Sequence, residues 1–283
     1  MAKIVSKKKK EKRQNTIIYI VLILMSIIWL IPFVYLVFQA FRGESTSMVN
    51  YILPRKWSFI NFKKLFKETE FLEWFKNTTI IALVVSVFQS IIVLMVSYTL
   101  SRLRFRGRKL LMNVILVLGM FPGFMSMIAV YFILKLFGLT QNIIGLMLIY
   151  IGSSGMGYYI AKGYFDTIPR SLDDAARIDG ATRRTVFYQI IMPMAKPIVI
   201  YTILMAFMAP WGDYMYASLI SHGNTNSYNV AVGLFTFLDK EQINNKFTLF
   251  CAGGVVIAIP ITILFMLLQK YYVAGVTGGA VKG

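Results

Sequence analysis

Few side chains in this sequence of 283 residues could carry out covalent chemistry. There is one cysteine, Cys251, and one histidine, His222, so neither an internal disulfide nor a His-based metal cluster can form. No glycine is followed directly by lysine, which excludes the pattern G-x-x-x-x-G-K-[ST] and ATP binding of that kind. We therefore predict no catalytic residue, no metal site and no cofactor bound by this chain, which is not expected to be an enzyme.

Asp213 is the one residue among Asp, Glu, Lys and Arg that lies inside the long apolar runs of the sequence. Ion-coupled carriers place charged groups within their membrane spans, where such groups mark ion pathways. Asp213 lies about 24 Å along a helix that starts at Pro197, which puts it near the far end of that span. A structural role and a role in a pathway or gate both remain open for it.

Six apolar runs are long enough to cross a bilayer, which takes about 20 residues as a helix. Hydrophobic residues make up 57% of the sequence and charged residues 15%, and the runs hold almost none of the charge. They are residues 17–41, 78–100, 110–133, 143–161, 197–220 and 249–269.

These runs must be helices, because a backbone exposed to lipid has to satisfy its hydrogen bonds internally. The first run is longer than the apolar part of a signal peptide, so we expect it to be retained as an anchor. The net charge of +18 would suggest nucleic acid in a soluble protein, but the cations flank apolar runs. The sequence therefore predicts an all-α integral membrane protein in a lipid bilayer, with no nucleic acid partner.

The distribution of lysine and arginine predicts the orientation of the chain. With the N-terminus inside, 20 of the 30 cations lie in inside segments and 10 in outside segments. The short segment 101–109 alone holds five of them. Both termini are therefore expected in the cytoplasm.

The first outer segment, residues 42–77, contains a candidate interfacial helix. Phe59, Phe62 and Phe66 fall three and four residues apart, while Lys63 and Lys64 lie largely on the other face. A helix resting on the outer headgroups fits this pattern. A packed loop with ordinary aromatic contacts fits it equally well.

The inside segment 162–196 carries the most informative pattern. Ser171 and Asp174 resemble a capping box, and the first turn is acidic, as the helix dipole favours. Gly180 is expected to end this helix. A second short helix is expected over residues 183–192, ending before Pro193. Such a helix–turn–helix could dock into a cleft of another protein, or be a cytoplasmic loop without a partner.

The spacing of this segment resembles the cytoplasmic motif of ABC importer permeases. That motif reads E-A-A-x-x-x-G, then nine residues, then I-x-L-P. The matching positions, which include Met192 in place of Leu, fall within the coupling segment, residues 171–193. Asp replaces the family's Glu, which puts the reach of the docking contact in doubt. The resemblance implies that ATPase-coupling contacts come from Ser171, Asp174, Ala175, Ala176, Gly180, Ile190 and Pro193.

The resemblance extends over most of the chain and is strongest to permeases of the carbohydrate-uptake family. Other similar stretches include residues 101–105, 120–122 and 162–165. In that family a Gly-rich tail reaches the ATPase dimer, which implies Gly278, Gly279, Lys282 and Gly283. The last outer loop meets the binding protein, which implies Asn226, Ser227, Tyr228 and Asn229. A frayed terminus is the plainer explanation of the tail.

The resemblance implies a multi-pass subunit of a bacterial cell membrane importer for sugars of the maltodextrin kind. A second permease subunit would complete a heterodimer, an ATPase dimer would bind ATP and Mg²⁺, and an extracytoplasmic sugar-binding protein would deliver substrate. Movement would follow alternating access. Met120, Phe121 and Pro122 could form a gate together with Asp213, although a packing kink explains the proline as well.

Two alternatives stay open at this point. One is an ion-coupled carrier or channel, and the other is an ABC permease for another polar solute such as glycerol phosphate. The expected organisation is a basic segment 1–16, a six-helix permease domain 17–269 and a tail 270–283. The permease domain holds a coupling helix between its fourth and fifth spans and the outer loop 221–248.

Overall fold

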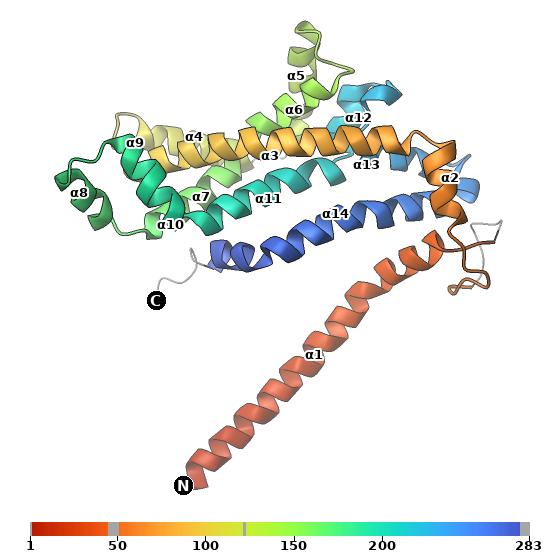
Figure 1. Ribbon diagram of the computed structural model, residues 1–283, viewed down its shortest axis with the longest axis horizontal. Helices are drawn as coiled ribbons and strands as arrows, with labels where there is room; N and C mark the ends of the chain where they lie inside the picture. The colour runs from red at the N-terminus through yellow and green to blue at the C-terminus, as the bar shows by residue number, and fades with distance from the viewer. Residues whose placement is uncertain (1, 45–50, 121–122, 278–283) are drawn as a thin grey trace. The chain divides into compact units, whose positions relative to one another are not determined.

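The computed structural model describes residues 2–44, 51–120 and 123–277 (Figure 1). Apart from one isolated β-bridge between Arg42 and Trp57, every regular element in these ranges is a helix, as predicted. The helices of seven or more residues are α1 (Ala2–Ala40), α2 (Ile60–Glu68), α3 (Phe71–Arg102), α4 (Arg108–Met120), α5 (Gly123–Leu136), α6 (Ile143–Gly152), α7 (Gly155–Thr167), α8 (Ser171–Ile178), α11 (Lys196–Gly212), α12 (Met215–Ser221) and α14 (Ile243–Thr277). The shorter ones are α9 (Arg183–Thr185), η1 (Val186–Ile191), α10 (Met192–Met194), η2 (Thr225–Ser227), α13 (Val230–Phe235) and η3 (Thr236–Leu238).

Within the described part of the chain, three helices are each long and apolar enough to cross a membrane, namely Gln14–Ala40 of α1, α3, and Ile243–Tyr271 of α14. Three bent pairs meet the same test when each pair counts as one span: α4 with α5, α6 with α7, and Arg183–Met194 with α11. The second and third pairs are bent by 42° and 81°. The predicted run 143–161 is therefore interrupted after α6. The predicted run 197–220 is interrupted as well, because α11 ends at Gly212 and α12 begins at Met215.

The chain forms two compact units, and the first comprises Met1–Glu68 with Phe237–Val256. Its best-buried charged side chain is Arg42, which is fully shielded from solvent. The guanidinium donates through Nε to Gln39 Oε1 (2.7 Å) and through Nη2 to the carbonyl oxygens of Tyr51 (3.0 Å) and Ile52 (2.9 Å). This arginine fastens the segment after α1 back onto the end of that helix.

Of the two alternatives for the aromatic segment, the structure has a helix from Ile60 to Glu68, which is α2, and Phe59 lies directly before it. The rings of Phe59 and Phe62 lie 5.2 and 5.0 Å from the Phe41 ring. Asn61 Nδ2 donates to Ala40 O (3.0 Å), so α2 also satisfies a carbonyl at the end of α1. These contacts favour a packed aromatic segment, while a position at the lipid headgroups stays a prediction.

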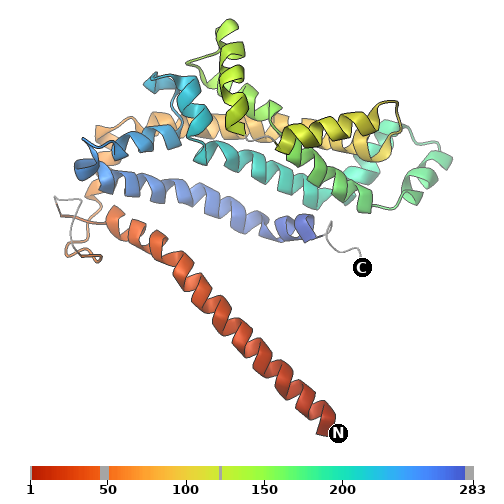
Figure 2. The same ribbon diagram turned by 180° about the vertical axis from the view of Figure 1, so that it is seen from behind.

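The second unit comprises Thr69–Thr236 with Ile257–Gly283. Within it α3 and α11 run side by side, and α7 packs against α3 as well (Figures 1 and 2). The segment α8–α10 lies at one end of α3, and α12 and α13 lie at the other. We call these the α8 end and the α12 end.

Small polar residues line the buried face of α3. Ser86, Ser90, Ser97 and Ser101 are all buried and recur at helical spacing. Small residues allow helix backbones to approach closely, and their hydroxyls can bond across helices. Ser97 Oγ, for example, donates to Tyr158 O of α7 at 3.0 Å. This face therefore sets α7 close against α3.

Candidate functional site

At the α8 end, Gly180 ends helix α8 as predicted. Its φ of +82° lies in the left-handed region. The Gly180 N–H donates to Arg177 O (3.1 Å), and the Ala181 N–H donates to Ala176 O (2.9 Å). This pair of bonds is the Schellman motif, which needs a glycine-like conformation at this position.

The predicted capping box at the start of α8 is wrong. Arg170 is the N-cap residue and Ser171 is the first helical residue, and no side chain caps the helix there. Ser171 lies one position too late for its hydroxyl to act as an N-cap. Asp173 and Asp174 do lie in the first turn, as predicted.

The second helix of the coupling segment continues past Pro193, so the predicted end before that proline is wrong. The helical path runs from Arg183 to Met194, and its middle part, η1, is a π-helix. Pro193 lies in α10, directly after the π-helical part of this path. The chain then bends by 81° and enters α11.

A buried ion pair joins α8 to α3. Arg102 Nη1 lies 3.1 Å from Asp173 Oδ2, and the two side chains are 4% and 9% exposed. Arg102 Nη2 also donates to the carbonyl oxygens of Phe165 (3.0 Å) and Ile168 (2.8 Å). One side chain at the end of α3 thus holds both the end of α7 and the start of α8. From the sequence, Arg102 was expected to contribute to the inside charge and to a stretch that resembles related permeases, but this ion pair was not predicted.

Further polar contacts close the same junction. Ser101 Oγ donates to Asp166 Oδ1 (2.6 Å), and Arg170 Nη2 donates to Ser101 O (3.0 Å). Lys162 Nζ donates to Asp166 Oδ2 at 2.5 Å. The end of α3, the end of α7 and the start of α8 therefore form one connected network.

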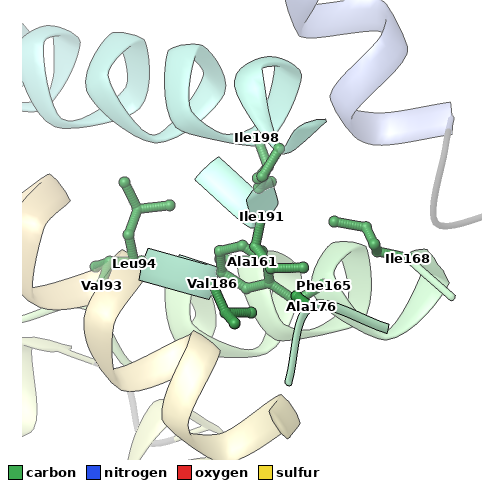
Figure 3. Packing of buried hydrophobic residues seen from close by; sticks show 10 residues of the cluster. Val93, Leu94, Ala161, Phe165, Ile168, Ala176, Val186, Ile191 and Ile198 are labelled. Atoms are coloured by element: carbon green, nitrogen blue, oxygen red, sulfur yellow. The ribbon is translucent and has the colours of Figure 1, made fainter. Parts of the chain in front are cut away.

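Ala176 joins α8 to an apolar cluster beneath the coupling segment (Figure 3). This alanine is 7% exposed, while its neighbour Ala175 faces solvent. The cluster draws buried side chains from α3, α7, η1 and α11. Its other members are Val93, Leu94, Ala161, Phe165, Ile168, Val186, Ile191, Ala195 and Ile198. A displacement of α8 would therefore disturb the packing of α3, α7 and α11, which extend toward the other end of the unit.

The outer surface of the coupling segment is available for a partner. Ser171, Asp174, Gly180 and Pro193 are exposed, and Ile190 is half-buried. Ile178 is 87% exposed, which is unusual for an isoleucine in a helix. A cavity of about 420 Å³ next to α8 is lined by Asp173, Asp174 and the arginines at 102, 104, 170, 177 and 183. A small apolar surface flanked by arginines suits a protein partner with an acidic rim.

Asp213 lies at the α12 end, directly after the last residue of α11. Its Oδ2 accepts the Tyr150 hydroxyl at 2.5 Å, and its Oδ1 accepts the Tyr216 N–H at 3.2 Å. Its carbonyl oxygen accepts from Asn229 Nδ2 at 2.7 Å. The carboxylate thus joins the ends of α6 and α12 across the helix break. Both carboxylate oxygens are engaged, which favours the structural role.

The four residues predicted to contact a binding protein differ in exposure. Asn226 is exposed and Tyr228 half-buried, whereas Ser227 is 6% and Asn229 0% exposed. Asn229 Oδ1 accepts from Val232 N (2.9 Å), so this side chain also caps α13. In this structure Asn229 supports the loop from within, and Asn226 is the one of the four that is open to solvent.

The same loop is fixed to the first turns of α3. Asn77 Nδ2 donates to the carbonyl oxygens of Asn226 (2.9 Å) and Tyr228 (3.0 Å). Gly233 packs directly on Trp74, where an added Cβ would collide with the indole ring. These contacts make the exposed part of the loop a rigid surface.

Several predicted site residues lie at or beyond the limits of the described chain. Met120 is the last residue of α4 and is 72% exposed. Phe121 and Pro122 lie outside the described residues, so the predicted gate is not described. The same holds for the tail residues Gly278, Gly279, Lys282 and Gly283.

The break between α6 and α7 was not predicted from the sequence. Gln89 of α3 lies opposite it, and its Nε2 donates to Tyr150 O (2.8 Å) and to Ser154 Oγ (2.5 Å). The run Gly152-Ser-Ser-Gly155 within an apolar segment was the available signal.

Comparisons with known proteins agree with this geometry. Residues 93–278 match the family described as binding-protein-dependent transport system inner membrane component. The maltodextrin transport system permease protein MdxG of Bacillus subtilis is 39% identical over 266 residues, covering 94% of this chain and 95% of that protein. The maltodextrin transport system permease protein MalD of Streptococcus pneumoniae is 36% identical, with 98% of each chain covered.

A solved structure shows the same fold. It is a bacterial ABC transporter involved in the import of the acidic polysaccharide alginate. The TM-score is 0.77 at 21% identity, covering 93% of this chain and 98% of that chain. The family match over residues 93–278 covers about two thirds of the sequence and includes the coupling segment with the glycine that ends α8. The chain therefore belongs to the family of binding-protein-dependent transport system inner membrane components, the permease subunits of ABC importers.

Proposed function

We propose that this permease subunit carries neutral oligosaccharides of the maltodextrin kind. The observation that supports this most is the 39% identity to a maltodextrin permease along 94% of the chain. The subunit is not itself an enzyme, since ATP hydrolysis in ABC importers belongs to a separate subunit. We propose that ATP and Mg²⁺ bind on that subunit, and that this chain binds no cofactor.

The coupling segment is proposed to dock on the ATPase. Ala175, Ile178 and Gly180 offer a small exposed surface, and the neighbouring arginines offer charge. The tail residues Gly278, Gly279, Lys282 and Gly283 are proposed to contact the same ATPase dimer. Movement of α8 would pass to α3 through Arg102 and to α7 and α11 through the apolar cluster. Such coupling requires a packed element with two arrangements.

The α12 end is proposed to face the extracytoplasmic binding protein. Asn226 is the exposed member of the loop and is the proposed contact, while Asn229 holds the loop in shape. A second permease subunit is proposed to complete the pathway. Met120, Phe121 and Pro122 remain the proposed gate of this subunit, and Asp213 is proposed to hold the ends of α6 and α12 in place.

We propose six spans with both termini in the cytoplasm. Three single helices and three bent pairs have the required length and composition. The excess of lysine and arginine in the segments 1–16, 101–109 and 162–196 supports this orientation. Single cysteines at exposed positions 182 and 225, in a Cys251→Ala background, would test it with an impermeant thiol reagent. Only position 225 should react in intact cells, and the reverse pattern would overturn the orientation.

Substrate identity is tested by uptake of labelled maltotriose into cells that express this chain with its second permease, ATPase and binding protein. Uptake should be ATP-dependent and should be competed by unlabelled maltodextrins. Cells that express all subunits with Gly180→Trp serve as the matched control. Competition by glycerol 3-phosphate but not by maltodextrins would favour another polar solute. Family membership leaves the ion-coupled carrier without support.

A further inference from the structure

A cavity of about 820 Å³ lies in the second unit beside the break between α6 and α7. Its walls come from α4, α5, the α6–α7 break, the start of α7 and α12. Five hydroxyl side chains line it, namely those of Ser126, Ser153, Ser154, Tyr158 and Tyr216. Among the described residues that line the cavity, none is charged. Its volume falls within the usual range for small-molecule sites.

The broken helix supplies polar backbone to this cavity. Ser153 and Ser154 leave helical geometry, with ψ angles of 61° and 23°. Irregular backbone within an apolar span is tolerated where it lines a cavity or is buried in protein. Gln89 satisfies the Tyr150 carbonyl from the α3 side. In secondary transporters, interrupted helices of this kind typically form the substrate site.

Glycines make room for the cavity where α4 meets α7. A Cβ on Gly155 would lie only 3.1 Å from the Cα of Gly119, so the two backbones are in close contact. Gly123 and Gly152 also line the cavity. A wall of this kind exposes peptide groups in place of bulky side chains.

Tyr216 connects the cavity to the helix break at Asp213. Its hydroxyl donates to Gly123 O (2.7 Å) and lies 3.3 Å from Ser126 Oγ. Its N–H donates to Asp213 Oδ1 (3.2 Å). A ligand that bonds to the Tyr216 hydroxyl would thus contact the same residue whose N–H joins the start of α12 to Asp213.

We propose that this cavity is a subsite for a neutral sugar, so that this chain itself contacts the substrate as it crosses. The inference rests on the proposed function and names the residues that would perform it. Hydroxyl groups donate and accept hydrogen bonds at once, which matches the hydroxyls of a sugar. Tyr158 and Tyr216 add aromatic rings with an apolar face. A phosphate or carboxylate substrate would be desolvated here without a cation, which disfavours glycerol phosphate and acidic sugars.

Protection of a single thiol tests the proposal in the full complex. In a Cys251→Ala background, Ser153→Cys is treated with a small hydrophilic thiol reagent. Binding protein is present in both arms, either empty or loaded with maltotriose, and an ATPase variant that cannot hydrolyse ATP holds the complex in its ATP-bound state. Labelling of Ser153→Cys should slow with maltotriose. Gly163→Cys on α7, the helix that follows the break, is the matched control, because a Cβ there meets nothing within 4 Å, and it should label at the same rate in both arms.

Transport stoichiometry provides a second readout. Tyr158→Phe should lower the number of maltotriose molecules imported per ATP hydrolysed by about threefold or more, because one hydrogen bond to substrate is lost. Tyr164→Phe, which removes a hydroxyl from the same helix outside the cavity, should leave this ratio unchanged.

The outcomes separate the subsite from the proposed function. Suppose that wild-type complex imports maltotriose, but maltotriose does not slow the labelling of Ser153→Cys and Tyr158→Phe does not lower the number of molecules imported per ATP. The subsite is then wrong and the proposed function stands. If wild-type complex does not import maltotriose although it assembles, the proposed function itself fails.

Discussion

Arg102, the last residue of α3, forms an ion pair with Asp173 in the first turn of α8, with 3.1 Å between Nη1 and Oδ2. The two side chains are almost fully buried. The long helix of the second unit is therefore attached directly to the segment proposed to receive the ATPase stroke.

The first prediction concerns this pair. Arg102→Ala should reduce maltotriose uptake per ATP hydrolysed and destabilise the subunit by about 3–5 kcal/mol, because it leaves Asp173 buried and uncompensated. Thermal unfolding of the purified complex and paired ATPase and uptake assays would measure both effects. Arg106→Ala, an exposed arginine of the same segment, is the control. Equal behaviour of the two variants would contradict the role of the pair.

Gly180 gives the second prediction. Gly180→Trp should uncouple ATP hydrolysis from uptake while insertion into the membrane stays normal. Any side chain at φ +82° is strained by about 1–2 kcal/mol, and a large one also alters the exposed surface. Gly180→Asn should be milder because asparagine tolerates the left-handed conformation. Normal sugar-stimulated ATPase activity together with normal uptake in Gly180→Trp would remove the docking proposal.

Asp213 gives the third prediction. Asp213→Asn should change uptake less than Gly180→Trp does, because an amide oxygen can still accept the Tyr150 hydroxyl. Asp213→Ala should lose both side-chain bonds and impair uptake more strongly. Initial uptake rates at equal amounts of assembled complex would rank the variants. A larger defect in Asp213→Asn than in Gly180→Trp would show that the negative charge itself matters.

The contact between Gly233 and Trp74 gives the fourth prediction. Gly233→Ala should destabilise the complex by about 1–3 kcal/mol, because the methyl group has no space against the indole. Gly212→Ala, where a Cβ meets nothing within 4 Å, should be close to neutral. Thermal melting of detergent-solubilised complexes would compare them. A stable Gly233→Ala variant would mean that the loop moves away from α3 in solution.

Local patterns in the sequence predicted much of the fold. The apolar runs correctly predicted where the long helices lie, because hydrophobicity over about 20 residues is a property of one segment alone. Gly180 was recognised as a helix end for the same reason, since the C-cap depends on one residue and its neighbours. The prediction of a capping box at Ser171 was wrong because the helix begins one residue earlier than that motif requires.

Contacts between distant segments were beyond the reach of those patterns. Nothing near Asp173 in the sequence indicates that its partner is Arg102. From the sequence, Arg102 counted toward the orientation of the chain, and Asp173 was placed in the first turn of a helix. Gln89 and Ser154 meet only because α3 and α7 pack together. Asn229 was predicted as a contact residue from its family position, whereas tertiary packing buries it completely.

Helix α3 has 32 residues, which is about 48 Å of uninterrupted helix. It holds the start of α8 through Arg102 and the loop after α12 through Asn77. Chimaeras that exchange only the loop, or only the coupling segment, between related permeases would break one set of these fastenings. Grafts intended to redirect such a transporter to a new delivery protein or a new motor should therefore move residues 71–236 as a single block.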